Sequence, residues 1–254
     1  MDIDAFMRDG YVVVRGAFDQ RTARACRDLI WAGLESEGIQ RDDTSTWTRP
    51  VVRVNCPSSE PFAEVAASPK LQAAYDALID ARRWRPPNIA GAVVPVRFPS
   101  EEYPGRVGYH IDGNWRIGNE WRTNVRSAGR GLLAIVLLSD VDPDDAPPRM
   151  VLGSHLYIPK LLVDAGEDGI GVGVASKVRS SVLCRRSAEA TGQAGDVFLC
   201  HPFLIHTATW PHRGTEPRMV AQPSIEVAGG FAIDGTDRSP VARAIVHGLR
   251  RTDD

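Results

Sequence analysis

The chain has 254 residues, of which 43% are hydrophobic and 24% charged, and its formal net charge is -2. This length can bury a substantial core, and the near-neutral charge argues against a general nucleic-acid binder, which usually carries a clear basic surplus. No segment approaches the roughly 18 apolar residues of a membrane span, and the N-terminus lacks the pattern of a secretory leader. We therefore expect a cytoplasmic protein with neither nucleic acid nor a membrane as a partner.

The first third of the chain is expected to be rich in helix. After a short opening helix, residues 11–15 (YVVVR) carry β-branched side chains and predict a strand. Asp19 is a candidate cap of a helix that ends near Gly38. Ser68 and Pro69 mark the start of another helix, because serine caps helix N-termini and proline suits the first turn.

From about residue 89 the pattern changes to short apolar runs between turn signals, such as GLLAIVLLSDV and GDVFLCHPFLIHTA. Strands at this spacing, without a helix after each, predict an antiparallel sandwich or barrel. Residues 155–178 interrupt the series with a predicted helix and a glycine-rich loop, which suits either a cover over a site or a plain solvated loop.

The chain shows no linker that would separate two domains. We predict one domain, in which a helix-rich part at about 1–88 packs on a β core at about 89–228. Ser239 and Pro240 begin a C-terminal amphipathic helix predicted over 239–251. The four cysteines form no Cys-x-x-Cys pair, so we expect reduced, mostly packed thiols at Cys26, Cys56, Cys184 and Cys200.

The stretch GYHIDGNW, residues 108–115, places His110 and Asp112 two positions apart. On a strand, residues i and i+2 project from the same face, so both side chains can aim at one point. Neutral imidazole and carboxylate are suitable ligands for a divalent metal such as Fe(II). The alternative is a solvated turn in which Asp112 and Gly113 form a local hydrogen bond.

A catalytic metal needs a third ligand, and the best candidate is His206 at the end of the strand-like run CHPFLIH. Two histidines and one carboxylate form the facial triad of non-haem iron enzymes, which leaves about three coordination positions open. His201 competes with His206, because a bulge at Pro202 would change which side chains share a face.

Arg218 strengthens the metal hypothesis. If residues 209–217 (TWPHRGTEP) form a hairpin centred near His212, then His206 and Arg218 become cross-strand neighbours with Cβ atoms roughly 5 Å apart. An arginine on the inner face of a barrel calls for an anion, and it suits a carboxylate because it donates two parallel hydrogen bonds. A metal with open positions beside such an arginine describes a site for 2-oxoglutarate. The alternative for Arg218 is a surface residue paired with Glu216.

Three stretches together resemble the phytanoyl-CoA dioxygenase family of Fe(II)- and 2-oxoglutarate-dependent oxygenases. The resemblance spans residues 5–225 and implies a mainly β fold with flanking helices and a double-stranded β-helix (jelly-roll, cupin-like) core. It also implies that His110, Asp112 and His206 bind iron and that Arg218 binds the cosubstrate's carboxylate. The three stretches are GYHIDGNW, LLSDVDPDDAPPRMVLGSH and GDVFLCHPFLIHTATWPHRGTEPRMVAQP.

The sequence departs from the family at two places. Members often carry an Asn-Gly pair followed by a small residue in the slot that reads DDAPPRM here, and a hydroxyl residue where this chain has Ala208. Both differences bear on how the cosubstrate is positioned. Related halogenases replace the metal-binding carboxylate by a small residue, so the presence of Asp112 favours hydroxylation over halogenation.

The segment after the metal pair is rich in arginine, which indicates an anionic substrate or a solvated cover balanced by nearby acids. Trp115 could line the substrate pocket or belong to the core. The candidate substrate-binding residues are Trp115, Asn124, Arg126 and Arg97.

We therefore expect a non-haem iron oxygenase that uses 2-oxoglutarate and O2 to hydroxylate, or otherwise oxidise, an unactivated C–H of a small polar metabolite, with release of succinate and CO2. The alternative is a cupin-like metalloenzyme or metal-binding module that does not use 2-oxoglutarate. Arg218 discriminates between the two hypotheses, because only an enzyme that uses 2-oxoglutarate needs an arginine to bind the cosubstrate's carboxylate.

Overall fold

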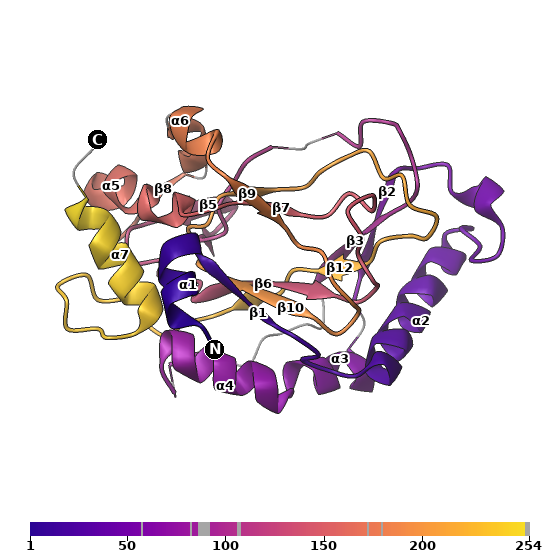
Figure 1. Ribbon diagram of the computed structural model, residues 1–254, viewed down its shortest axis with the longest axis horizontal. Coiled ribbons are helices and arrows are strands. Elements are labelled where there is room, and N and C mark those ends of the chain that lie inside the picture. Colours follow the sequence, from indigo (N-terminus) through magenta and orange to yellow (C-terminus); the bar gives the residue numbers. More distant parts are fainter. Residues whose placement is uncertain are drawn as a thin grey trace.

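The run LLAIVL forms the centre of the largest sheet. In the computed structural model it is strand β6 (Leu132–Leu137), whose six side chains are all buried, as expected for a strand covered on both faces. Its neighbours are antiparallel, and the strand order is β1, β10, β6, β12, with β13 also pairing with β6 (Figure 1). These partners are β1 (Tyr11–Val14), β10 (Val197–Cys200), β12 (Val220–Ala221) and β13 (Ser224–Ile225).

The other strands form three smaller antiparallel sheets. The structure describes residues 1–56, 58–81, 83–85, 92–105, 108–171, 173–178 and 180–251, and the predicted boundary at residues 88 and 89 lies outside them. One sheet pairs β2 (Val51–Asn55) with β3 (Val93–Arg97); a second has the order β11 (His206–Thr207), β7 (Arg149–Val151), β9 (Ser187–Glu189); a third has the order β4 (Trp115–Ile117), β5 (Glu120–Thr123), β8 (Ile170–Gly171).

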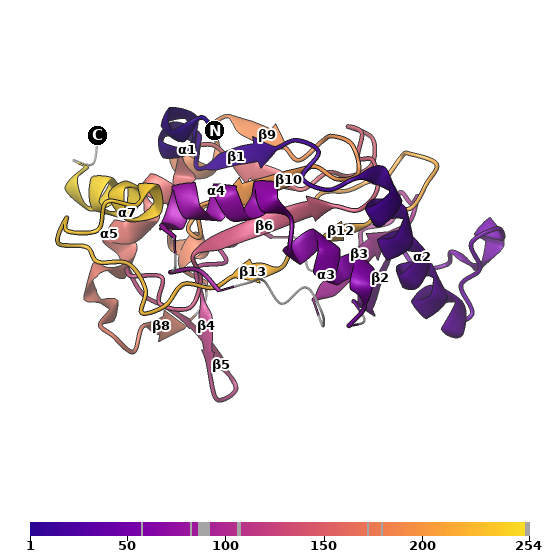
Figure 2. The ribbon, with the colours of Figure 1, turned by 90° about the horizontal axis from the view of Figure 1, so that it is seen from below.

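Helices cover the outer side of the large sheet, and Figure 2 shows α3 and α4 lying along it. One hydrophobic core joins side chains of α2, α4 and α7 to those of β6 and β10, including Ile30, Leu71, Ile245, Leu132 and Leu199. The helices are α1 (Ile3–Asp9), α2 (Gln20–Ser36), α3 (Glu60–Ala66), α4 (Pro69–Ile79), α5 (Ile158–Leu162), α6 (Ser180–Leu183) and α7 (Pro240–Arg250), with 3-10 turns at Thr44–Thr46, Ser154–Leu156, Val163–Ala165 and Val174–Lys177.

The helix starts predicted from the sequence are confirmed. Asp19 accepts a hydrogen bond from the backbone N–H of Thr22 at 2.7 Å, which caps α2. Ser68 and Ser239 cap α4 and α7 in the same way, each with proline at the first helical position. The strand predicted over residues 11–15 is β1.

The insertion at 155–178 contains the predicted helix, α5, and packs against the C-terminal helix. Gly248 of α7 approaches it so closely that a Cβ there would lie 2.7 Å from the carbonyl oxygen of Leu156. Strand β8, at the other end of the insertion, pairs with β5. The two ends of the insertion are thus held by α7 and by β5.

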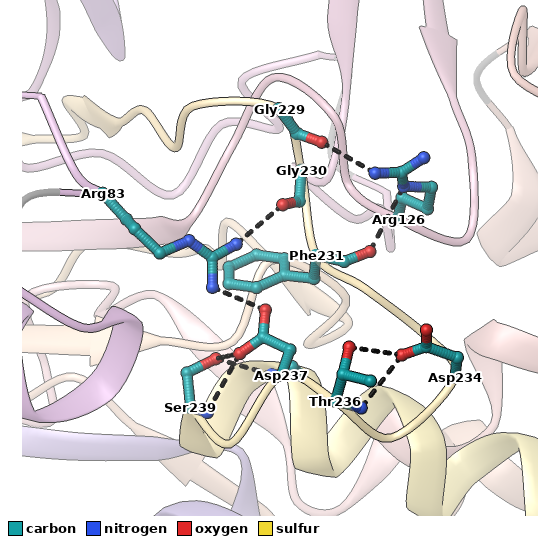
Figure 3. A network of polar contacts seen from close by, with 10 residues as sticks. Arg83, Arg126, Gly229, Gly230, Phe231, Asp234, Thr236, Asp237 and Ser239 are labelled. Carbon is teal, nitrogen blue, oxygen red and sulfur yellow. Dashed lines mark hydrogen bonds and ion pairs between the residues drawn. The ribbon is translucent and has the colours of Figure 1, made fainter.

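A polar network holds the loop before α7 in place (Figure 3). Arg83 forms an ion pair with Asp237 at 2.5 Å and donates to the carbonyl oxygen of Gly230 at 2.8 Å. Arg126 donates to the carbonyl oxygens of Phe231 and Gly229 at 3.3 and 3.1 Å. We call Arg83 and Arg126 the clamp arginines, because their donors tie this loop to the body of the protein.

The four cysteines are free thiols, as predicted, and Cys184 alone among them is exposed. Burial raises the pKa of the Cys26 and Cys56 thiols, to about 12 and about 11. These thiols are therefore protonated and packed rather than reactive. Among the described residues, no helix is long and apolar enough to cross a membrane.

Candidate metal centre

Two distant chain segments meet through the backbones of His110 and His206. Each residue donates its N–H to the carbonyl oxygen of the other at 3.0 Å. His206 also pairs with Met150 of β7, so it is fixed on both sides by strand-like contacts. The pairing brings the two imidazole rings side by side, with centroids 4.2 Å apart.

Asp112 completes the cluster. One ligand atom from each of His110, Asp112 and His206 lies within 4.8 Å of the others, and Asp112 Oδ2 lies 3.6 Å from His206 Nε2. A divalent ion is bound by imidazole nitrogen and carboxylate oxygen at about 2 Å, so ligand atoms this close can share one ion. The predicted convergence of these three side chains is therefore present.

The route to this convergence differs from the prediction. A strand was expected at 108–115, but the only pairing within 108–114 is the single bridge at His110, and β4 begins at Trp115. Asp112 reaches the cluster through a turn, in which Asn114 donates its N–H to the Asp112 carbonyl oxygen at 2.7 Å. Gly113 lies against the Phe203 ring, where a Cβ would come within 2.5 Å of the ring. Close packing, rather than strand alternation, positions this turn.

Both histidines are oriented for metal binding. His110 Nδ1 lies 2.9 Å from the carbonyl oxygen of Gly108, and His206 Nδ1 lies 3.1 Å from that of Leu204. A carbonyl oxygen only accepts, so each Nδ1 carries the proton and each Nε2 presents a lone pair. His206 Nε2 is buried and has no hydrogen-bond partner among the described residues. A buried nitrogen lone pair without a donor fits a metal ligand.

The protonation states also suit a cation. Burial lowers the pKa of His206 to about 4, so its imidazole is neutral at pH 7. Burial alone would raise the pKa of Asp112, but the neighbouring His206 and Arg130 lower it below its usual value. The centre thus offers a neutral imidazole at His206 and a carboxylate at Asp112, and together with His110 these residue types match the donor set of the facial triad.

A cavity of about 60 Å³ lies beside the two histidines. It is also lined by Arg97 and Arg218, so the two histidines of the cluster and two guanidinium groups share one space. The complete lining consists of Pro95, Arg97, His110, Pro148, His206, Thr207, Ala208, Arg218, Val220 and Gln222.

The two arginines of the cavity lie on paired backbones. Arg97 donates its N–H to the Arg218 carbonyl oxygen at 3.0 Å, and Arg218 returns the bond at 2.8 Å. The side chains are 7% and 3% exposed, and neither Nε atom has a hydrogen-bond partner among the described residues. Burial and the nearby Arg97 lower the pKa of Arg218 to about 9. Two buried, like-charged groups with free donors favour the binding of an anion.

The hairpin predicted around His212 is wrong. His206 pairs with His110, His212 with Ser100, and Arg218 with Arg97, so the segment forms antiparallel bridges to residues 97, 100 and 110 instead of folding on itself. The expected proximity of His206 and Arg218 still arises, because both line the same cavity. The alternative of a surface Arg218 is also wrong, since its side chain is buried and its Nη1 donates to the Ala146 carbonyl oxygen at 2.6 Å.

The sequence profile of the phytanoyl-CoA dioxygenase (PhyH) family matches residues 6–220. The chain belongs to this family. No curated protein sequence matches significantly. Solved structures with the same fold include the epimerase SnoN in complex with Fe3+, alpha ketoglutarate and nogalamycin RO, with 20% identity, TM-score 0.61 and coverage of 89% of this chain and 82% of that one.

Two further similar structures extend this comparison. The alpha ketoglutarate dependent carbocyclase SnoK from nogalamycin biosynthesis has 18% identity, TM-score 0.56 and coverage of 90% and 85%. HygX from Streptomyces hygroscopicus, with nickel, 2-oxoglutarate and hygromycin B bound, has 17% identity, TM-score 0.53 and coverage of 92% and 91%. Likeness at this level establishes the fold, and it confirms the predicted jelly-roll core.

Within this PhyH-family chain, three of the four predicted substrate residues lie away from the cavity lining. Trp115 packs on Gly129. Asn124 is buried and donates to the Glu167 carbonyl oxygen at 3.1 Å, and Arg126 is a clamp arginine (Figure 3). Their roles in substrate binding stay predictions, whereas Arg97 does line the cavity.

His201, the competitor of His206, faces another part of the molecule. Its Nδ1 accepts from the Phe203 N–H at 3.1 Å, and its Nε2 lies 3.3 Å from the Val241 carbonyl oxygen of α7. Arg130, one of the arginines that indicated an anionic substrate but not one of the candidate substrate-binding residues, has its Nη1 3.5 Å from Asp112 Oδ2. Arg130 belongs to the arginine-rich segment, but spacing alone does not distinguish it from its neighbours.

Proposed function

We propose that this protein is an Fe(II)- and 2-oxoglutarate-dependent oxygenase that hydroxylates, or otherwise oxidises, an unactivated C–H of a small polar metabolite. The carrying observation is that one cavity wall combines the free His206 Nε2 with the buried, partly unpaired guanidinium of Arg218. Family membership supports the proposal, as do the similar structures that contain a metal with 2-oxoglutarate or alpha ketoglutarate.

In this proposal each residue has a separate task. His110, Asp112 and His206 hold the ion and leave about three positions open. Arg218 binds the far carboxylate of 2-oxoglutarate through paired hydrogen bonds, with Arg97 beside it as a second positive charge. When bound, iron and 2-oxoglutarate supply the oxidising power, with consumption of O2 and release of succinate and CO2.

The protein's own contribution is orientation and shelter. Reciprocal backbone hydrogen bonds join His110 to His206 and Arg97 to Arg218. These bonds fix the spacing between the proposed metal ligands and the arginine proposed to bind the cosubstrate's carboxylate. Burial of the two guanidiniums strengthens their attraction for the cosubstrate's charge. Because Asp112 occupies the carboxylate position of the triad, we propose hydroxylation rather than halogenation.

We further propose that residues 1–254 form one catalytic domain in the cytoplasm that acts on a small molecule. The shared hydrophobic core of the N-terminal helices, the large sheet and α7 supports a single unit. The names of similar structures include an epimerase, a carbocyclase and a monooxygenase, so outcomes other than hydroxylation belong to the same chemistry.

Anaerobic titration with Fe(II) and 2-oxoglutarate, followed by visible absorption, tests the proposal. We expect a charge-transfer band that saturates with 2-oxoglutarate, and succinate formation once air and a metabolite library are added. Absence of both the band and succinate with every compound would reject the proposal.

The Arg218→Ala variant separates this function from a metalloenzyme that does not use 2-oxoglutarate. We expect the variant to bind Fe(II) as the wild type does, but to need far more 2-oxoglutarate for the band. Arg213→Ala is the matched control, because Arg213 lies five residues away and forms an exposed ion pair with Glu101 at 2.9 Å. Equal 2-oxoglutarate affinity in the wild type and both variants would favour the alternative.

A further inference from the structure

Arg130 has a position in the site that neither the metal nor the cosubstrate explains. Its guanidinium is 13% exposed and lies 3.5 Å from Asp112 Oδ2, and its Nε is buried without a hydrogen-bond partner among the described residues. The other arginines of the same segment bond to protein atoms elsewhere: Arg116 bonds Gly118 and Asn119, and Arg126 is a clamp arginine. Arg122 also has a buried Nε without a partner in the described part of the chain, but its Nη2 donates to the Gly169 carbonyl oxygen at 3.0 Å, whereas the Arg130 guanidinium approaches only Asp112 there.

The backbone holds Arg130 firmly. Its N–H donates to the Ser127 carbonyl oxygen at 3.2 Å, and the Ser127 hydroxyl donates back to the Arg130 carbonyl oxygen at 2.7 Å. The next residue, Gly131, donates to the Ile225 carbonyl oxygen at 2.7 Å, directly before β6. The guanidinium therefore starts from a fixed point, and its approach to Asp112 is not the chance conformation of a free surface arginine.

Arg130 approaches the ligand cluster at Asp112, whereas Arg218 shares a cavity with His110 and His206. The cavity that contains Arg97 and Arg218 is not lined by Arg130. The residue before Arg130 instead contacts the start of the β4–β5 hairpin, since a Cβ on Gly129 would lie 3.3 Å from Trp115 Cα. This hairpin projects from the body of the protein in Figure 2. Arg97 and Arg218 thus neighbour the two histidines of the cluster, and Arg130 neighbours its carboxylate.

The charges of the loaded centre leave a place for an anion. Arg97, Arg130, Arg218 and a divalent ion bring five positive charges, while Asp112, the Asp145 that faces Arg218, and a dicarboxylate bring four negative ones. Once a metal binds the Asp112 carboxylate, the negative charge of Arg130's one anionic partner among the described residues is shared with the ion. A buried guanidinium with a free donor then favours an oxyanion from the remaining ligand.

We propose that Arg130 is the substrate-binding residue beside Asp112 of the metal centre and that the substrate carries an oxyanion, a carboxylate or a phosphate. This inference rests on the proposed oxygenase function and deepens it. It assigns the anionic group of the substrate to Arg130 rather than to the predicted Arg126, because each of the three guanidinium nitrogens of Arg126 already has a partner.

The test uses full-length protein loaded with Co(II) and saturating 2-oxoglutarate, because Co(II) has a visible spectrum that reports ligands near the metal. Acetate and inorganic phosphate are the probes. We expect a saturable spectral change in the wild type and at least ~10-fold weaker binding in Arg130→Gln, as loss of a charge-assisted hydrogen bond predicts. Arg130→Lys keeps the charge and is expected to recover part of the affinity, which also shows that the site tolerates substitution.

Arg116→Gln is the matched control, because Arg116 lies in the same segment and bonds only its local turn. The proposal is overturned if neither probe changes the wild-type spectrum, or if Arg130→Gln binds them as the wild type does. It is also overturned if Arg130→Gln weakens Co(II) binding as strongly as probe binding, since Arg130 would then act by orienting Asp112. Failure of the oxygenase proposal gives a different result. In that case 2-oxoglutarate would not bind, and binding of acetate or phosphate would still be measured on the Co(II) protein without 2-oxoglutarate.

Discussion

The clamp arginines and the arginines of the metal centre are the same residue type in opposite situations. Arg83 and Arg126 direct their donors at carboxylates and carbonyl oxygens of neighbouring segments (Figure 3). The centre arginines Arg97, Arg130 and Arg218 each have a buried Nε with no partner among the described residues. The terminal nitrogens of the clamp arginines thus bond within the protein, whereas each centre arginine keeps at least one buried nitrogen without a partner in the described part of the protein.

The hydrogen-bond partners of a buried guanidinium thus distinguish structural from ligand-binding arginines within one fold. A buried guanidinium with filled donors contributes to stability, while one with open donors lowers stability until a ligand arrives. The free energy of unfolding and the ligand affinity should therefore respond in opposite ways to substitution in the two groups. Each of the following predictions tests that contrast.

The largest effect is expected from His206→Ala, which removes the metal and with it most of the attraction for 2-oxoglutarate. Substituting a residue that only hydrogen-bonds to a metal ligand lowers metal affinity by about 10–100-fold. Loss of the ligand His206 itself should therefore lower it by more than ~100-fold. Isothermal titration with Co(II) measures the effect. His212→Ala is the control, because His212 is equally buried but bonds Glu216. Wild-type metal affinity in His206→Ala would contradict the assignment.

Arg218→Met should separate ligand binding from stability. We expect 2-oxoglutarate affinity to fall by about 100-fold, since a bidentate charged contact is worth about 3 kcal/mol. The free energy of unfolding of the metal-free protein should stay within ~1 kcal/mol, because the variant replaces an incompletely paired charge by an apolar chain of similar length. Urea denaturation and 2-oxoglutarate titration give both values. A large loss of stability would place Arg218 among the clamp arginines.

Arg83→Met should give the opposite pattern. Breaking its contact with the nearly buried Asp237 is expected to lower the free energy of unfolding by about 2 kcal/mol, less than for a fully buried pair because Arg83 is partly exposed. Affinity for 2-oxoglutarate should not change. Arg85→Met is the control, since Arg85 is exposed and lies 3.9 Å from Glu226. Weaker 2-oxoglutarate binding in Arg83→Met would break the contrast.

The smallest effect is a pH dependence of the same clamp. Burial would raise the pKa of Asp237, but the bonds from Arg83 and Ser239 lower it below the ordinary value of 3.8. A carboxyl with a lowered pKa in the folded state adds stability above the ordinary pKa and loses it as the pH falls through the folded value. The stability difference between wild type and Arg83→Met should thus shrink below pH 3.8, as acid denaturation curves would show. A constant difference would contradict this.

Local signals in the sequence predicted much of the fold. Asp19, Ser68 and Ser239 cap the helices they were expected to cap, because the bonds of a cap lie within three residues. The family resemblance added the jelly-roll core and the ligand set of His110, Asp112 and His206. The structure brings these three together, although through a turn rather than a strand.

Contacts between distant segments were beyond the sequence. The turn-rich stretch around His212 has the composition of a hairpin, and nothing local shows that its partner is residue 100. The same limit applies to the arginine-rich segment. Arg126 and Arg130 look alike in sequence, but Gly229 and Phe231 engage the first while Asp112 engages the second.

The antiparallel run of 97–110 beside 206–218 is held at separate points, with bridges at Arg97–Arg218, Ser100–His212 and His110–His206. The two histidines of the proposed metal site lie at one end of this ribbon, and Arg97 and Arg218, the proposed partners of the cosubstrate, pair at the other. Between the anchors, residues 101–105 are mostly exposed and take part in no β-bridge. Evolution can therefore remodel this stretch, and a protein engineer can graft a new loop there, to change which molecules reach the iron while the oxidising machinery is inherited intact.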